Sequence, residues 1–201
     1  MKVARAGDRY VITPDAAREQ VPLKIGGCSV AGLTLSFFQE VDRTSRYMKT
    51  AQSFFTVISN SEREPLIRLE YDASHQRAVS HWQIHAERGA FTELLTRANL
   101  MSRVQRPYDI SKLHFPTGGE RFRPALEDFL EFLLRECGFD AVSGWKSAIR
   151  NSREAWRRLQ FRTAVRELPR EAADILRREG WTVNEPSTGS PKTWRKPYRR
   201  Q

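Results

Sequence analysis

The sequence predicts an α+β protein in which an N-terminal antiparallel β-meander is covered by helices from the C-terminal half. Up to residue 88, the chain contains segments rich in β-branched and aromatic residues, and in 65–72 and 81–87 apolar and polar side chains alternate with the period of two that is typical of strands. From residue 89 onward, apolar side chains recur at spacings of three and four, as in helices. Strands followed by helices are typical of the α+β class. With 201 residues, of which 39% are hydrophobic, the chain is long enough for one domain over residues 1–183.

The predicted strands are segments rich in β-branched and aromatic residues, separated by turn-forming residues. The clearest alternation is in 65-PLIRLEYD-72, where Ile67, Leu69 and Tyr71 alternate with charged residues. Short connections between these segments favour antiparallel pairing, with one packed face and one polar face. The predicted strands cover residues 9–13, 29–41, 50–60, 65–72 and 81–87.

The predicted helices are marked by apolar stripes and by residues that favour helix ends. The clearest is 124-PALEDFLEFLLRECG-138, with proline at its start, acidic residues in its first turn and glycine at its end. Asn151 and Glu154 have the spacing of a capping box, which predicts a helix beginning at residue 152. The predicted helices cover residues 90–104, 124–138, 152–168 and 169–180.

Positive charge is concentrated at the C-terminal end. Of the net charge of +10, residues 146–201 carry 15 Lys/Arg and 6 Asp/Glu, a balance of +9. Such an excess attracts polyanions and favours nucleic acid, RNA or DNA, as the partner. Residues 184–201 contain three prolines and no apolar periodicity, and we expect a disordered basic tail. A solvated, arginine-rich surface without a partner is the alternative.

The expected nucleic-acid contacts are arginines at helical spacing and cations interleaved with aromatic rings. Guanidinium groups suit phosphate, and exposed aromatic rings stack on unpaired bases. The candidate residues are Arg153, Arg157 and Arg158 in the helix and Lys192, Trp194, Arg195, Lys196, Tyr198, Arg199 and Arg200 in the tail. The same tail would also suit an acidic protein surface.

A second candidate site is the polar face predicted for 81-HWQIHAE-87. His81 and His85 stand roughly 13 Å apart on one strand, too far to act on one phosphate or to bind one metal ion. A neighbouring strand brings other polar groups within about 5 Å. We therefore hypothesise a metal-independent acid–base site, in which an arginine stabilises the phosphate. Its residues would be His85, Glu87, Arg68 and Glu70, with the register left open. The alternative is a charged ladder that only stabilises the sheet.

The segment 113-LHFPTGGERFRP-124 contains two adjacent glycines, followed by Arg121 and Arg123. Such a loop can hold an anion on its backbone N–H groups, but it lacks the lysine and the spacing of a P-loop. A simple turn before the helix explains the glycines equally well. His114 could approach the polar face.

Three segments of the sequence resemble segments of known protein groups. The motifs 81-HWQIHAERGAF-91, 113-LHFPTGGERFRPALEDFLEFLL-134 and 180-GWTV-183 resemble an uncharacterised group of proteins from actinobacteria and their mobile elements. This resemblance implies a bacterial cytoplasmic protein and supplies no activity. More distantly, the order of an acidic strand, an H-x-x-x-H strand and an LEDxLxFL helix is similar to TumE-like toxins of toxin–antitoxin pairs. This chain is longer than such toxins.

The leading hypothesis is a cytoplasmic protein that binds nucleic acid non-specifically through its basic helices and tail. One alternative is a metal-independent ribonuclease toxin with an antitoxin as protein partner, and another is a protein-interaction module of a mobile or defence locus. No cofactor or metal is expected, since Cys28 and Cys137 lack zinc-site spacing and are expected to be free buried thiols. No apolar run is long enough to cross a membrane.

Overall fold

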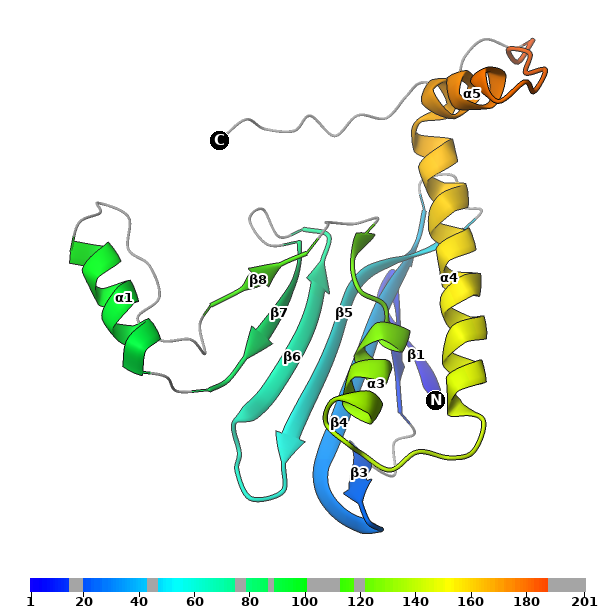
Figure 1. Ribbon diagram of the computed structural model, residues 1–201. Coiled ribbons are helices and arrows are strands. Elements are labelled where there is room, and N and C mark those ends of the chain that lie inside the picture. The colour runs from blue at the N-terminus through cyan, green and yellow to red at the C-terminus, as the bar shows by residue number, and fades with distance from the viewer. Residues whose placement is uncertain are drawn as a thin grey trace. The chain divides into compact units, whose positions relative to one another are not determined.

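The computed structural model describes residues 1–14, 20–42, 47–74, 79–86, 89–100, 113–117 and 122–187 (Figure 1). The chain divides into two compact units, the sheet unit Met1–Ile149 and the helical unit Arg150–Gln201. The predicted disordered tail lies almost entirely outside the described residues. No helix in the described ranges has the length and apolar character needed to cross a membrane.

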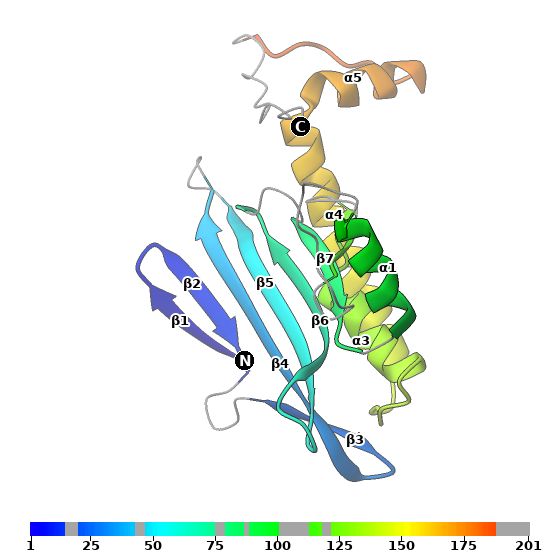
Figure 2. The same ribbon diagram turned by 90° about the vertical axis from the view of Figure 1, so that its left-hand side faces the viewer.

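The sheet unit is built on an eight-stranded antiparallel sheet, which confirms the predicted α+β class. Seven strands follow one another in the order β1-β2-β4-β5-β6-β7-β8, and β3 also pairs with β4. Figure 2 shows the central strands β4, β5, β6 and β7 running side by side, with the β1–β2 hairpin at one edge. The strands are β1 (Lys2–Ala6), β2 (Arg9–Thr13), β3 (Val21–Ile25), β4 (Cys28–Val41), β5 (Met48–Ser59), β6 (Pro65–Asp72), β7 (Ser80–Ile84) and β8 (Phe115–Pro116).

Strand β4 is long enough to pair with two partners along one edge. Its first half pairs with β3 and its second half with β2. The β3–β4 turn consists of Gly26 and Gly27, both with positive φ (58° and 82°). A two-residue type I′ turn requires this conformation at both positions, and glycine adopts it without strain. Asp140 accepts hydrogen bonds from both backbone N–H groups, at 3.0 and 2.7 Å, and so holds the turn from a distant segment.

The core lies between one face of the sheet and helix α3 (Leu126–Arg135). Phe129 is fully buried, and its ring lies 5.8 Å from that of Phe55 and 5.4 Å from that of Trp82. Leu133 packs one turn later on the same face of α3. At the N-terminus of α3, Asp128 accepts a hydrogen bond from the Ala125 N–H at 2.8 Å.

The other helices are α1 (Gly89–Leu100), α4 (Trp145–Glu167) and α5 (Pro169–Arg178). The predicted start at residue 152 is wrong, because α4 begins at Trp145, seven residues earlier. Trp145, Ala148 and Ile149 continue the helical spacing backwards from residue 152, and Ile149 is buried. Glu154 pairs with Arg158 along the helix, so it does not close a capping box.

Both cysteines are free, as predicted, but only one is shielded from solvent. Cys28 is exposed at the first position of β4, which corrects the expectation of two buried thiols. Cys137 is half-buried after α3, and burial together with the negative charge of Glu136 raises the pKa of its thiol.

Candidate nucleic-acid interface and histidine cluster

The polar face of the sheet lies opposite α3. Trp82 packs on Phe129 of α3, so His81 and Gln83, its neighbours along β7, point to the other face. The register places Glu70 of β6 directly across from His81, and Arg68 across from Gln83. Residues that share this face are therefore cross-strand neighbours, about 5 Å apart.

Glu70 lies near two cationic or potentially cationic groups. Its Oε2 is 3.6 Å from Nε2 of His81, and its Oε1 is 3.9 Å from Nη1 of Arg68. The His114 ring, next to β8, stacks on the His81 ring with centroids 4.1 Å apart and planes inclined by 21°. We call Arg68, Glu70, His81 and His114 the histidine cluster. It combines two imidazoles, a carboxylate and a guanidinium contributed by three segments of the chain.

Exposure differs strongly across the histidine cluster. The His81 side chain is 7% exposed, whereas those of Glu70 and Arg68 are 24% and 35% exposed. His114 is an exposed residue. Solvent therefore reaches His114 more readily than His81, on whose ring the His114 ring is stacked.

The predicted acid–base residues are brought together only in part. Arg68 and Glu70 are adjacent on this face, as the hypothesis required. His85 follows the end of β7, where its backbone N–H donates to Leu66, so it is not the histidine opposite Glu70. Glu87 lies outside the described residues. Alternation alone could not choose between His81 and His85, because both point to the same face.

Arg123, from the glycine-containing loop, is buried against the other face of the sheet. Its guanidinium lies 4.0 Å from the centre of the Tyr71 ring, a cation–π contact. This contact gives Arg123 a place in the packing around α3. The two glycines and Arg121 lie outside the described residues, so the predicted anion loop stays a prediction.

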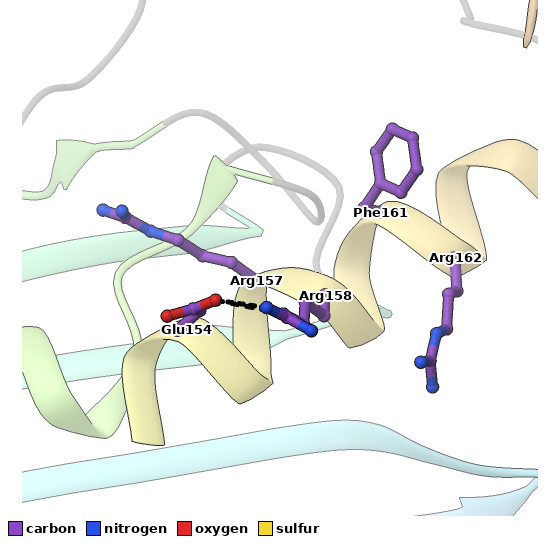
Figure 3. Close-up of a pocket in the computed structure, with 5 residues that line it drawn as sticks. All are labelled: Glu154, Arg157, Arg158, Phe161 and Arg162. Carbon is purple, nitrogen blue, oxygen red and sulfur yellow. Dashed lines mark hydrogen bonds and ion pairs between the residues drawn. The ribbon is translucent and has the colours of Figure 1, made fainter. Parts of the chain in front are cut away.

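The second candidate site is a face of α4 within the helical unit. Glu154, Arg157, Arg158, Phe161 and Arg162 line an open depression on this helix (Figure 3). Their positions, at i, i+3, i+4, i+7 and i+8, place them on one side of an α-helix. We call Arg157, Arg158 and Arg162 the arginine face.

The three guanidinium groups of the arginine face differ in the ion pairs and hydrogen bonds that they form. Arg158 donates to Glu154 at 2.5 Å, the contact drawn in Figure 3. Among the residues that the structure describes, Arg157 and Arg162 take part in no ion pair or side-chain hydrogen bond. Both are exposed. Two guanidinium groups on this face are therefore available to an anionic partner.

The other residues predicted to contact nucleic acid are either half-buried or outside the described ranges. Arg153 lies on α4 four residues before Arg157, next to the arginine face on the helix surface, but it is half-buried. The seven tail candidates, Lys192 to Arg200, lie outside the described residues. Phe161 also lines the depression and was not among the predicted contacts, although its spacing from Arg157 and Arg158 could have identified it.

Comparison with protein-family models, curated proteins and solved structures gives no match for this chain. The resemblances to actinobacterial mobile-element proteins and to TumE-like toxins therefore stay predictions.

Proposed function

We propose that this protein binds nucleic acid through the arginine face of α4, by phosphate contacts that are independent of base sequence. The observation that carries the proposal is the exposure of Arg157 and Arg162 on one side of α4, without ion pairs among the described residues. Guanidinium groups bind phosphate with two parallel hydrogen bonds, and each contact releases a condensed counterion. The cations of residues 192–200 would add to the same electrostatic attraction.

The histidine cluster supports binding less well than the arginine face does. Of its two imidazoles, only that of His114 belongs to an exposed residue. The arginine face offers several exposed cations on one continuous surface. For this reason the proposal rests on α4, and cleavage is the second candidate.

The experiment is a titration of fluorescently labelled, mixed-sequence RNA and DNA oligomers, followed by fluorescence anisotropy at low and moderate salt. We compare the full chain with the double variant Arg157→Glu/Arg162→Glu. The matched control is Lys2→Glu/Arg5→Glu, which changes the net charge equally at two exposed residues of β1. We expect about a tenfold or greater loss of affinity for the α4 variant and a much smaller loss for the control.

Two results would contradict the proposal. Equal losses in both variants would mean that net charge alone attracts the oligomers. Absence of binding at low salt would mean that the arginine face is a solvated surface, and a protein-interaction module would then be the better interpretation.

The second candidate function is metal-independent ribonuclease activity at the histidine cluster, as in a toxin of a toxin–antitoxin pair. It is favoured by the stacking of His114 on His81 beside Glu70. In such a reaction one group takes the proton of a ribose 2′-hydroxyl as its oxygen attacks the phosphorus. A second group protonates the departing 5′-oxygen, and Arg68 stabilises the phosphate charge.

The test of this second function is growth on induced expression, together with RNA cleavage in the presence of a chelator. We expect His114→Ala to abolish toxicity and cleavage, whereas His85→Ala, the matched control, keeps both. Cleavage that survives His114→Ala, or the absence of any cleavage by the unaltered chain, would contradict this candidate.

A further inference from the structure

Phe161 is an aromatic side chain placed in solvent beside the arginine face. Its ring is 70% exposed although it lies in the middle of α4. Arg157 and Arg158 precede it by four and three residues, so their side chains are its neighbours on the helix surface. Figure 3 shows the ring projecting from the helix with none of the other labelled side chains over it. A largely exposed aromatic ring thus lies next to cations on α4.

The helical unit repeats this combination at Trp181. This residue is 67% exposed just after α5, and Arg177 and Arg178 occupy the last turn of that helix. Its position is fixed, because its N–H donates to the Leu176 carbonyl at 2.9 Å and Gly180 turns the chain with a φ of 86°. An exposed ring within four residues of two arginines therefore occurs twice in the described residues 150–187, although Arg177 also pairs with Asp174.

An exposed ring next to cations distinguishes between the two forms of nucleic acid. In a duplex the faces of the bases are covered by stacking, so an aromatic ring on a helix surface meets sugar, phosphate and base edges but no base faces. In a single strand the base faces are open, and stacking on aromatic side chains adds affinity without regard to sequence. Guanidinium groups beside such a ring can contact the phosphates of the same strand.

We infer that the nucleic acid bound by the helical unit is single-stranded, with the Phe161 ring stacked on an unpaired base and the Trp181 ring offering a second stacking surface. This inference rests on the proposed function, since it assigns the form of nucleic acid that the arginine face takes. It assigns base stacking to Phe161, a role that the distribution of positive charge does not explain.

The experiment compares a 20-nucleotide single strand with the duplex of the same sequence, using the full chain and two variants. Phe161→Ala removes the ring. Leu159→Ala is the matched control, because Leu159 is also an exposed apolar residue of α4 but lies two positions away, about 200° around the helix. We expect tighter binding of the single strand, a loss of about fivefold to a hundredfold for Phe161→Ala, and little change for Leu159→Ala.

The salt dependence separates stacking from charge. Because Phe161 contacts no phosphate, its removal should leave the slope of log K against log salt unchanged. Trp181→Ala should weaken single-strand binding in the same way, which provides a second test if Phe161→Ala proves poorly folded by circular dichroism.

The outcomes distinguish this inference from the proposed function. Binding of both forms that Phe161→Ala and Trp181→Ala leave unchanged would overturn single-strand stacking while leaving phosphate binding in place. Equal losses in Phe161→Ala and Leu159→Ala would also overturn it, because an effect shared by opposite sides of α4 cannot come from stacking on the Phe161 ring. No binding of either form would overturn the proposed function and this inference together.

Discussion

The sheet unit and the helical unit use their side chains in opposite ways. Every hydrophobic core residue in the described ranges belongs to the sheet unit, and no described residue of the helical unit is buried. Residues 150–201 carry 14 Lys/Arg and 6 Asp/Glu, most of the net charge of +10. The comparison indicates that the packed core of the sheet unit stabilises the fold. The helical unit instead exposes charged side chains to solvent. Mutations in the two units should therefore affect different measurements.

The largest expected effect is that of Phe129→Ala in the sheet unit. Its ring is fully buried against Phe55 and Trp82, so truncation leaves a cavity at the centre of the core. We expect a loss of about 3–5 kcal/mol in the free energy of unfolding, measured with chemical denaturant. Phe161→Ala, which removes the same ring from an exposed position in the helical unit, should cost less than about 0.5 kcal/mol. Similar costs for the two variants would contradict the comparison.

A smaller effect is expected from Asp140→Ala. Its carboxylate accepts hydrogen bonds from Gly26 and Gly27 and so ties the β3–β4 turn to the segment after α3. Loss of both bonds should lower the free energy of unfolding by about 1–2 kcal/mol. Asp174→Ala removes an exposed ion pair with Arg177 in the helical unit and should change it by less than about 0.5 kcal/mol. If the Asp174 variant lost as much, the helical unit would contribute to stability after all.

The smallest expected effect is a pH dependence at Glu40. Lys49 at 2.8 Å, with a further contribution from Arg9 at 3.6 Å, lowers the pKa of this carboxyl, although its partial burial opposes the shift. Because the folded-state pKa is below the unfolded-state pKa, the carboxylate stabilises the fold above the unfolded-state value. That contribution is lost as the pH falls through the folded-state pKa.

The measurement for Glu40 is denaturant unfolding of the unaltered chain and Glu40→Gln between pH 7 and pH 3. We expect Glu40→Gln to be less stable at pH 7 by up to about 1 kcal/mol, with the difference shrinking in acid. A difference that stays constant down to pH 3 would show that the charge of Glu40 has no stabilising role.

Local patterns predicted much of the sheet unit. Alternation in 65–72 and the apolar stripe of 124–138 identified β6 and α3, because each pattern reports which side chains face the core. Strands β1 and β3 were not predicted. β1 (KVARA) has a single β-branched residue, and Pro22 weakens the strand signal of β3, whereas the equally short β2 (RYVIT) is rich in β-branched and aromatic residues.

The histidine cluster could be predicted only in part. Alternation placed His81, His85, Arg68 and Glu70 on one face, but the pairing of Glu70 with His81 depends on the register between two strands. The stacking of His114 on His81 depends on the pairing of β7 with β8, which lie more than 30 residues apart in sequence. Contacts of this kind are set by the turns and by the core, not by any local pattern.

The arginine face was more accessible to prediction, because helical spacing is a local property. Arg157 and Arg158 were selected from the sequence, and Arg162 and Phe161 follow from the same period. What the sequence could not supply was which arginines are paired, since the bond between Glu154 and Arg158 depends on side-chain conformation. That pairing is the reason why Arg157 and Arg162 carry the functional proposal.

The most direct test of the account is the salt dependence of oligonucleotide binding by the full chain and by Arg157→Gln/Arg162→Gln. If both guanidinium groups contact phosphates, the slope of log K against log salt should become shallower by about 1.4 for a single strand. The free energy of unfolding should stay unchanged, because both side chains are exposed. An unchanged slope, with binding still present, would show that the arginine face of α4 does not contact nucleic acid.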